Sequence, residues 1–318
     1  MRATRLASEP IIRPHMDAHM GDNINGPSLI RAPAWLADTE AGRLGEYYLY
    51  FADHKGRYIR LAYADQLAGP WHTYEPGTLQ LEQSHFPTAA DQFAPELAEL
   101  AAKGWVYPHV ASPDAQVDDA AGQVRLYYHG QLTDGRQVSR VALSDDGVHF
   151  EARDEILSTS YLRMIRLDDV TEPGWYGMSM PGILYRSDDG LTEFEQGPQL
   201  FPDTMRHCAL LHQRRAQGDT LWVFWSNVGD TPERILASPI MLTGDWRTWT
   251  AGPAQDVLRP AYDWEGATLP ISPSVRGYAP KPVHELRDPA VFAENGDAWL
   301  LYTVQGERGI AIAQLDPS

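Results

Sequence analysis

The sequence predicts an all-β fold, a five-bladed β-propeller, on two observations. The first is a strand-turn-strand unit that returns about five times along the 318 residues. Its clearest copies are residues 144–150 (SDDGVHF) and 187–194 (SDDGLTEF), each preceded by an apolar strand. Asp-Gly between two strand-like runs indicates a tight hairpin, because glycine accepts a positive φ. The second is composition, since 10 Trp, 15 Tyr and 8 Phe favour strands and 24 Pro with 26 Gly mark many turns.

Five such units take up nearly all of the chain, as expected for blades around one axis. A β-sandwich is the alternative, but roughly 40 to 80 residues separate equivalent second strands, which is too long for a simple sandwich. We place the units at residues 25–71, 105–150, 161–194, 206–249 and 286–315.

We expect residues 1–318 to form a single domain with insertions near residues 75–103 and 254–284. The first insertion ends in an Ala/Glu/Leu-rich stretch, residues 92–103, that predicts a short helix. The fifth unit stops at Leu315 without a fourth strand. We therefore expect the N-terminal segment before Asp22 to pair there and close the ring, which would remove an exposed sheet edge.

Charge and composition exclude several classes of partner. The net charge is −17, so the surface repels phosphate backbones, and we expect neither nucleic acid nor an anionic membrane as a partner. The single cysteine, Cys208, excludes an intramolecular disulfide and a thiolate metal cluster. No apolar run approaches the roughly 20 residues of a membrane helix, and residues 1–14 lack a signal-peptide core. We expect a cytoplasmic protein without a cofactor.

Several motifs resemble those of the five-bladed propeller glycosidases, glycoside hydrolase family 43 and relatives such as family 117. They are residues 287–292 (RDPAVF) followed by 298–302, residues 104–110 (GWVYPHV) followed by 125–128, and the repeated Ser-Asp-Asp-Gly turn. The resemblance spans about residues 22–315 and implies a carbohydrate pocket at the narrow end of the ring. Family 43 enzymes characteristically use an Asp base, a second Asp that tunes a pKa, and a Glu acid.

The chain departs from this family pattern in two blades. His109 stands where an Asp is expected in the second blade, and the third blade offers Tyr161 and Arg163 but no Glu. Family 117-like enzymes are thought to use a histidine as the acid. The resemblance therefore keeps the histidines of this chain among the candidates for the proton donor.

Glycoside hydrolysis requires a proton donor for the leaving oxygen and a carboxylate that acts as base or nucleophile. Asp22 precedes the first strand, where a propeller glycosidase carries its base, although it could simply form an Asx turn. Asp288 starts the first strand of unit five beside Arg287, which could hold it ionised or form a purely structural pair. Glu265 adjoins Trp264, an apolar setting suited to an acid, with a solvated loop carboxylate as the alternative.

Two histidines occupy matching places on the first strands of units two and four. His207 is our candidate acid ahead of His109, which we assign to substrate binding. The histidine spacing carries no metal motif, so we predict no metal site. Trp225 could stack on a sugar ring or belong to the core. The predicted substrate-binding residues are Asn25, His54, His109, His129, Arg163, Trp225, Arg287 and Gln305.

These residues predict a glycoside hydrolase that acts on a small oligosaccharide or glycoside in the central pocket. Asp22 would be the base, and Glu265 or His207 would be the acid. Asp288 with Arg287 would orient the substrate and tune the pKa of the acid. Two alternatives stay open. A glycoside phosphorylase would need a cationic phosphate subsite, and a non-catalytic propeller would bind a sugar or a protein without turnover.

Overall fold

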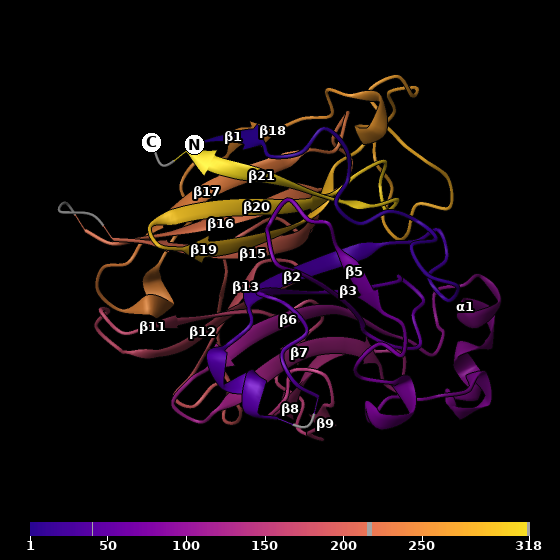
Figure 1. Ribbon diagram of the computed structural model, residues 1–318, viewed down its shortest axis with the longest axis horizontal. Coiled ribbons are helices and arrows are strands. Elements are labelled where there is room, and N and C mark those ends of the chain that lie inside the picture. Colours follow the sequence, from indigo (N-terminus) through magenta and orange to yellow (C-terminus); the bar gives the residue numbers. More distant parts are fainter. Residues whose placement is uncertain (40, 215–217, 317–318) are drawn as a thin grey trace. The chain divides into compact units, whose positions relative to one another are not determined.

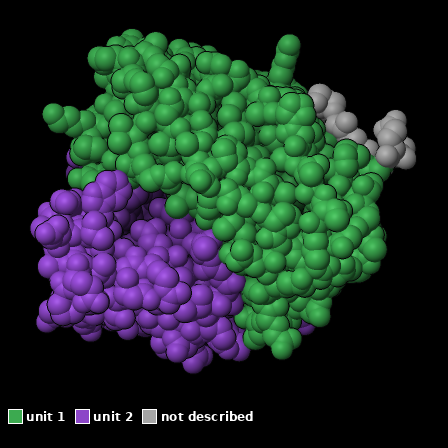
Figure 2. All heavy atoms as spheres, turned by 180° about the vertical axis from the view of Figure 1, so that it is seen from behind, with its two compact units in different colours: residues 1–14, 163–318 green, residues 15–162 purple. Residues whose placement is uncertain are grey.

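The computed structural model describes residues 1–39, 41–214 and 218–316. Within these residues the strands form five antiparallel sheets, one for each predicted blade (Figure 1). This confirms the predicted all-β, five-bladed propeller. The chain divides into two compact units, shown in different colours in Figure 2. Unit 2 is His15–Leu162 and holds the first two blades, and unit 1 is Met1–Pro14 with Arg163–Ser318 and holds the other three. The single-domain assignment stays a prediction.

Unit 2 contains blades one and two. The strands of blade one follow the order β2-β3-β4-β5, and β8 in blade two also pairs with the short strands β9 and β10. The helix expected at residues 92–103 is present as α1 (Ala98–Ala102), after three short 3-10 turns. The strands are β2 (Asn25–Arg31), β3 (Tyr47–Ala52), β4 (Arg60–Ala64), β5 (His72–Tyr74), β6 (Val110–Asp118), β7 (Gln123–Gln131), β8 (Gln137–Ser144), β9 (Glu151–Ala152) and β10 (Ser158–Thr159).

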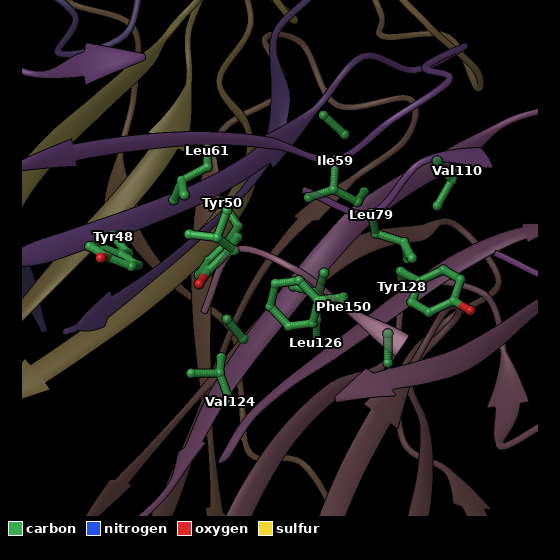
Figure 3. Close-up of a cluster of buried hydrophobic side chains, with 14 of the residues drawn as sticks. Tyr48, Tyr50, Ile59, Leu61, Leu79, Val110, Val124, Leu126, Tyr128 and Phe150 are labelled. Carbon is green, nitrogen blue, oxygen red and sulfur yellow. The ribbon is translucent and has the colours of Figure 1, made fainter. Parts of the chain in front are cut away.

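The core of unit 2 lies between these two sheets and consists of aromatic and branched side chains (Figure 3). Tyr50 and Phe150 meet edge to face with ring centroids 5.9 Å apart. Phe150 is the aromatic residue that closes the first Ser-Asp-Asp-Gly turn, so the recurring sequence motif supplies a core contact as well as a turn.

Unit 1 contains blades three, four and five. In blade four, the strand β18 (Gln255–Leu258) lies within the range that the sequence assigned to the second insertion. Residues 246–248, where the sequence predicted the end of this blade, form a 3-10 turn. The strands of blade three are β11 (Arg163–Leu167), β12 (Gly174–Ser179), β13 (Ile183–Ser187) and β14 (Glu195–Gln199). Those of blade four are β15 (Met205–Gln213), β16 (Thr220–Asn227), β17 (Ile235–Met241) and β18 (Gln255–Leu258). Those of blade five are β19 (Arg287–Glu294), β20 (Asp297–Thr303) and β21 (Ile310–Asp316), with β1 (Arg2–Arg5).

The strand β1 completes blade five. It pairs antiparallel with β21, from Arg2 opposite Asp316 to Arg5 opposite Ala313. This pairing confirms that the N-terminal segment supplies the fourth strand that the sequence lacks after Leu315, and it covers the free edge of β21.

The two Ser-Asp-Asp-Gly turns are held by their own side chains. Asp146 Oδ1 accepts the backbone N–H groups of Val148 and His149, both at 2.8 Å. Asp189 repeats this arrangement with two backbone N–H groups. Burial alone would raise the pKa of Asp189, but these hydrogen bonds, together with those from the Thr192 and Ser187 hydroxyl groups, outweigh it and lower the pKa to about 2. The turns are thus stabilised as ionised Asx turns and have a structural role.

Four first strands carry a β-bulge near their beginning, where the register with the second strand shifts. Gly26, Ser112 and Asp288 lie in these bulges with φ of +56°, +48° and +48°. A proline follows each of them. In β15 the bulge contains Arg206 and His207, so Arg206 has the register position that Asp288 has in β19. For a serine or an aspartate the left-handed conformation is strained, and such strain is concentrated at functional sites.

The bulge at Gly26 leaves no space for a side chain. A Cβ atom there would lie 2.9 Å from Ser112 Cα, whereas a Cβ on Gly42, at a similar φ of +67°, would meet nothing within 4 Å. We expect Gly42→Ala to cost about 1 kcal/mol from backbone strain alone. Gly26→Ala should cost clearly more, as measured by chemical denaturation. Equal losses in the two variants would contradict the steric argument.

Candidate functional site

The first strands of blades four and five bring His207 and Asp288 together. His207 Nδ1 and Asp288 Oδ1 form an ion-pair contact between β15 and β19. Their exposed fractions are only 6% and 1%. A buried carboxylate that faces Nδ1 fixes the ring orientation and directs Nε2 away from the pair, an arrangement used for proton transfer in many enzymes.

A buried cluster of two arginines and three glutamates lies beside this pair in unit 1. We call Arg206, Glu233, Glu285, Arg287 and Glu307 the arginine–glutamate cluster. Arg206 binds Glu233 through two hydrogen bonds of 2.9 and 3.3 Å. Arg287 donates to Glu285 at 2.7 Å and to Glu307 at 3.2 Å. Each arginine directly precedes a member of the His207–Asp288 pair in the sequence.

Charges in this cluster shift the pKa of its members. Burial raises the pKa of Glu285, and the positive charge of Arg287 only partly opposes this. Burial alone would lower the pKa of Arg287, but Glu233, Glu285 and Glu307 outweigh it and raise that pKa. Arg287 therefore stays charged, and Glu285 is a carboxyl that takes up a proton more readily than a solvated glutamate.

Glu265 is fully buried, with an exposed fraction of 0%, and has structural partners. Arg5 binds both of its carboxylate oxygens at 2.7 Å, and the Tyr302 hydroxyl donates to Oε1 at 2.9 Å. The backbone N–H groups of Ala261 and Tyr262 donate to Oε2. Glu265 is therefore neither a solvated loop carboxylate nor part of the His207–Asp288 contact, and it anchors β1 to the 3-10 turn Asp263–Glu265.

Asp22, the predicted base, lies on the surface of unit 2. Its side chain is 61% exposed, and Oδ1 lies 2.8 Å from His15 Nε2. The adjacent Asn23 accepts the backbone N–H of His54 at 2.8 Å and the side-chain amide of Asn25 at 3.2 Å. The catalytic role of Asp22 stays a prediction.

Unit 2 also contains a group of rings around two buried histidines, His109 and His129. The His109 ring centroid lies 4.6 Å from that of Tyr107 and 5.4 Å from that of His129. The His129 and Tyr161 centroids are 4.0 Å apart. Lys55 Nζ lies 4.9 Å from the Tyr107 ring centroid, within cation–π range. The structure thus brings two of the predicted substrate-binding histidines together.

The polar atoms of this region suit hydrogen bonding to hydroxyl groups. His109 Nδ1 lies 3.0 Å from the Tyr107 carbonyl oxygen, so it carries the proton in the neutral ring and Nε2 is an acceptor. Asn25 is buried, and its Oδ1 accepts no hydrogen bond from any residue that the structure describes. A buried unsatisfied acceptor of this kind fits a ligand donor or a bound water.

His109 makes the stability of the fold dependent on pH. Burial lowers its pKa to about 4, the hydrogen bond to Tyr107 opposes this shift, and the charge of His54 adds to it. In the unfolded chain the pKa is near 6.5, so as the pH falls from 6.5 to 4 the unfolded state binds a proton that the folded state excludes. Between pH 7.5 and 5, wild-type unfolding free energy should fall by about 2 kcal/mol more than that of His109→Gln. The control is His19→Gln at an exposed position, which should keep the wild-type pH dependence. An identical pH dependence of the unfolding free energy in the wild type and His109→Gln would refute the prediction.

The remaining predicted substrate-binding residues lie in different settings. Trp225 belongs to the core of unit 1, where its ring packs edge to face on Phe201 at 5.2 Å. Gln305 donates to the Asp263 carbonyl oxygen at 3.1 Å and so supports the turn that holds Glu265. Arg163 is buried at the start of β11. Their roles in substrate binding stay predictions.

The residues predicted from the sequence do not include Arg206, Glu233, Glu285 and Glu307. Arg206 and Glu285 each lie within two residues of a predicted site residue, and Glu307 lies two residues after Gln305. One signal could have found Arg206, because it directly precedes His207 in the sequence, as Arg287 directly precedes Asp288. Glu233, in a loop between β16 and β17, carried no such signal.

Within residues 1–39, 41–214 and 218–316, no three His, Cys, Asp or Glu side chains lie close enough to hold a metal ion together. None of the helices there has the length and apolar character needed to cross a membrane.

The fold is similar to that of family 43 glycoside hydrolases. CoXyl43, a β-xylosidase/α-arabinofuranosidase from a compost microbial metagenome, is 14% identical with a TM-score of 0.58, over 98% of this chain and 95% of its own. A family 43 enzyme from Xanthomonas citri is 13% identical with a TM-score of 0.58, over 98% and 92%. An exo-1,5-α-L-arabinanase from a bovine ruminal metagenomic library is 10% identical with a TM-score of 0.53, over 93% and 94%.

At these identities the similarity shows the fold alone. It confirms the resemblance to family 43 propellers, and none of these structures bears on the family 117-like features. No protein-family model matches the chain. In sequence, the chain is 36% identical to uncharacterized protein R118 of Acanthamoeba polyphaga mimivirus, over 92% of this chain and 83% of the viral protein. The chain therefore belongs to the same family as the mimivirus protein R118.

Proposed function

We propose that this protein is a glycoside hydrolase that acts on a small neutral oligosaccharide or glycoside. The observation that carries the proposal is the buried contact between His207 Nδ1 and Asp288 Oδ1. It lies on the first strands of two blades, in a fold shared with family 43 glycosidases. Asp288 is also strained, with a φ of +48°, which supports a functional role for this carboxylate.

In this proposal His207 is the general acid and Asp288 holds it in place. His207 Nε2–H protonates the glycosidic oxygen while the bond from that oxygen to the anomeric carbon breaks. A carboxylate base takes one proton from water, and the water oxygen forms the new bond to the anomeric carbon. Asp22 remains the predicted base. Glu265 is not assigned as the acid, because its oxygens accept hydrogen bonds from Arg5, Tyr302 and two backbone N–H groups.

The charges of the chain favour a neutral substrate. The net charge is −17, and the arginine–glutamate cluster contains one more carboxyl group than guanidinium groups. In unit 2, the acceptors His109 Nε2 and Asn25 Oδ1 suit hydroxyl donors. The negative charge of the chain therefore disfavours a uronic acid as the substrate.

The same contacts argue against Arg287 as a phosphate subsite, which a glycoside phosphorylase would need. Its guanidinium already donates to Glu285, Glu307 and the Gly277 carbonyl oxygen, so a phosphate would have to displace carboxylates. Hydrolysis by water is the simpler outcome for this arrangement.

The test is incubation with a panel of neutral aryl glycosides and oligosaccharides, with and without phosphate, followed by proton NMR. Hydrolysis without phosphate supports the proposal, and the anomer formed first distinguishes inversion from retention. Turnover only with phosphate would indicate a phosphorylase. Binding without turnover, with the protein folded, would indicate a sugar-binding propeller and overturn the proposal.

A further inference from the structure

The two arginines of the arginine–glutamate cluster share one set of acceptors. Arg206 and Arg287 both donate to the Gly277 carbonyl oxygen at 3.1 Å. Glu233 binds Arg206 through both carboxylate oxygens, and its Oε2 lies 3.6 Å from Arg287 Nε. Glu233 therefore bridges the arginines that precede His207 and Asp288.

Glu233 is itself held by further hydrogen bonds of its side chain and backbone. It is fully buried, and the Ser226 hydroxyl donates to its Oε1 at 2.7 Å. Its backbone carbonyl accepts the N–H of Leu286, the residue before Arg287, at 3.1 Å. Side chain and backbone of this one residue thus hold both β15 and β19 at the place where the His207–Asp288 pair forms.

Stability alone does not account for such a cluster. Burying ion pairs costs desolvation free energy, and an apolar core of similar volume is often equally or more stable. What charged groups add is direction, because a guanidinium held by two carboxylate oxygens has a fixed position and orientation. Each arginine is joined by one peptide bond to a member of the pair, so fixing the arginine limits where the next side chain can point.

We propose that Glu233 is a positioning residue that, through Arg206 and Arg287, sets the contact between His207 and Asp288. This inference rests on the proposed function for its catalytic meaning, but the contact itself is measured without substrate. The predicted consequence is that loss of the Glu233 charge moves the His207 ring even though Glu233 does not touch it.

The experiment records the ring nitrogen and proton NMR signals of His207 in the full-length protein, without substrate. Asp288→Asn first defines the signal positions when the carboxylate is lost. Glu233→Gln should shift the His207 signals toward those positions, and Ser226→Ala, which removes only one hydrogen bond to Glu233, should cause a smaller shift in the same direction. The control is Glu46→Gln, because Glu46 forms a salt bridge with Arg43 at the surface of unit 2.

Unchanged His207 signals in folded Glu233→Gln and Ser226→Ala would overturn the proposal, even if both variants melt at a lower temperature. That result would leave Glu233 a purely structural residue. If Glu233→Gln does not fold, Ser226→Ala decides alone. If the His207 signals shift in Glu233→Gln but the wild-type protein turns over no glycoside, the proposed function is refuted and the positioning role remains.

Discussion

Replacing Asp288 with Asn is expected to lower kcat/KM for an unactivated glycoside by about 10²–10⁴-fold without unfolding the protein. The amide keeps the size of the side chain but loses the charge that faces His207 Nδ1. The imidazole then loses the partner that fixes its orientation and its tautomer. His207→Gln should lose a similar factor, because it removes the proton donor itself.

The leaving group distinguishes an acid defect from a general loss of activity. An aryl glycoside with a strongly electron-withdrawing leaving group needs no protonation, so both variants should retain much more activity on it. Equal losses on activated and unactivated substrates would contradict the acid role of His207. Asp65→Asn, at an exposed position of unit 2, is the control, and Asp22→Asn tests separately whether Asp22 is the base.

The second large effect concerns the anchor of β1. Arg5→Ala is expected to destabilise the fold by about 3–5 kcal/mol, because it leaves the buried carboxylate of Glu265 without its cation. Glu265→Ala should have an effect of similar size, since Arg5 and the Tyr302 hydroxyl lose their acceptor. Chemical denaturation measures both losses.

The double variant completes the test of this anchor. If the two residues act as one unit, Arg5→Ala with Glu265→Ala should cost much less than the sum of the single variants. Additive losses would show that the ion pair does not couple β1 to the 3-10 turn. Deleting residues 1–12 should also lower thermal stability, because blade five then loses its fourth strand.

Most of the fold could be predicted because its signals are local. The Asp-Gly turns at residues 144–150 and 187–194 specify hairpins through bonds within a few residues, and the structure contains those bonds. The missing fourth strand after Leu315 was also visible in the sequence, and β1 fills it. The repeated strand-turn-strand unit therefore predicts the blades, which no single segment of the chain could do.

The candidate site was less predictable because its contacts join residues distant in sequence. The burial of Glu265 depends on Arg5, which is 260 residues away, so its neighbour Trp264 gave no guide to its partners. Glu233 meets Arg206 across 27 residues from a loop without periodicity. The sequence predicts both His207 and Asp288 as site residues, but no pattern in it indicates that they form a pair.

The pairing of β1 with β21 also affects how the chain folds during synthesis. About 300 residues separate β1 from β21, so β1 leaves the ribosome long before its partner strand is synthesised. Loop closure over so long a separation is slow, and blade five cannot be completed before β21 is synthesised. A fusion partner at the N-terminus would be attached to β1 while this strand is still unpaired. A bulky partner is therefore expected to affect the folding yield more than the activity of the folded protein.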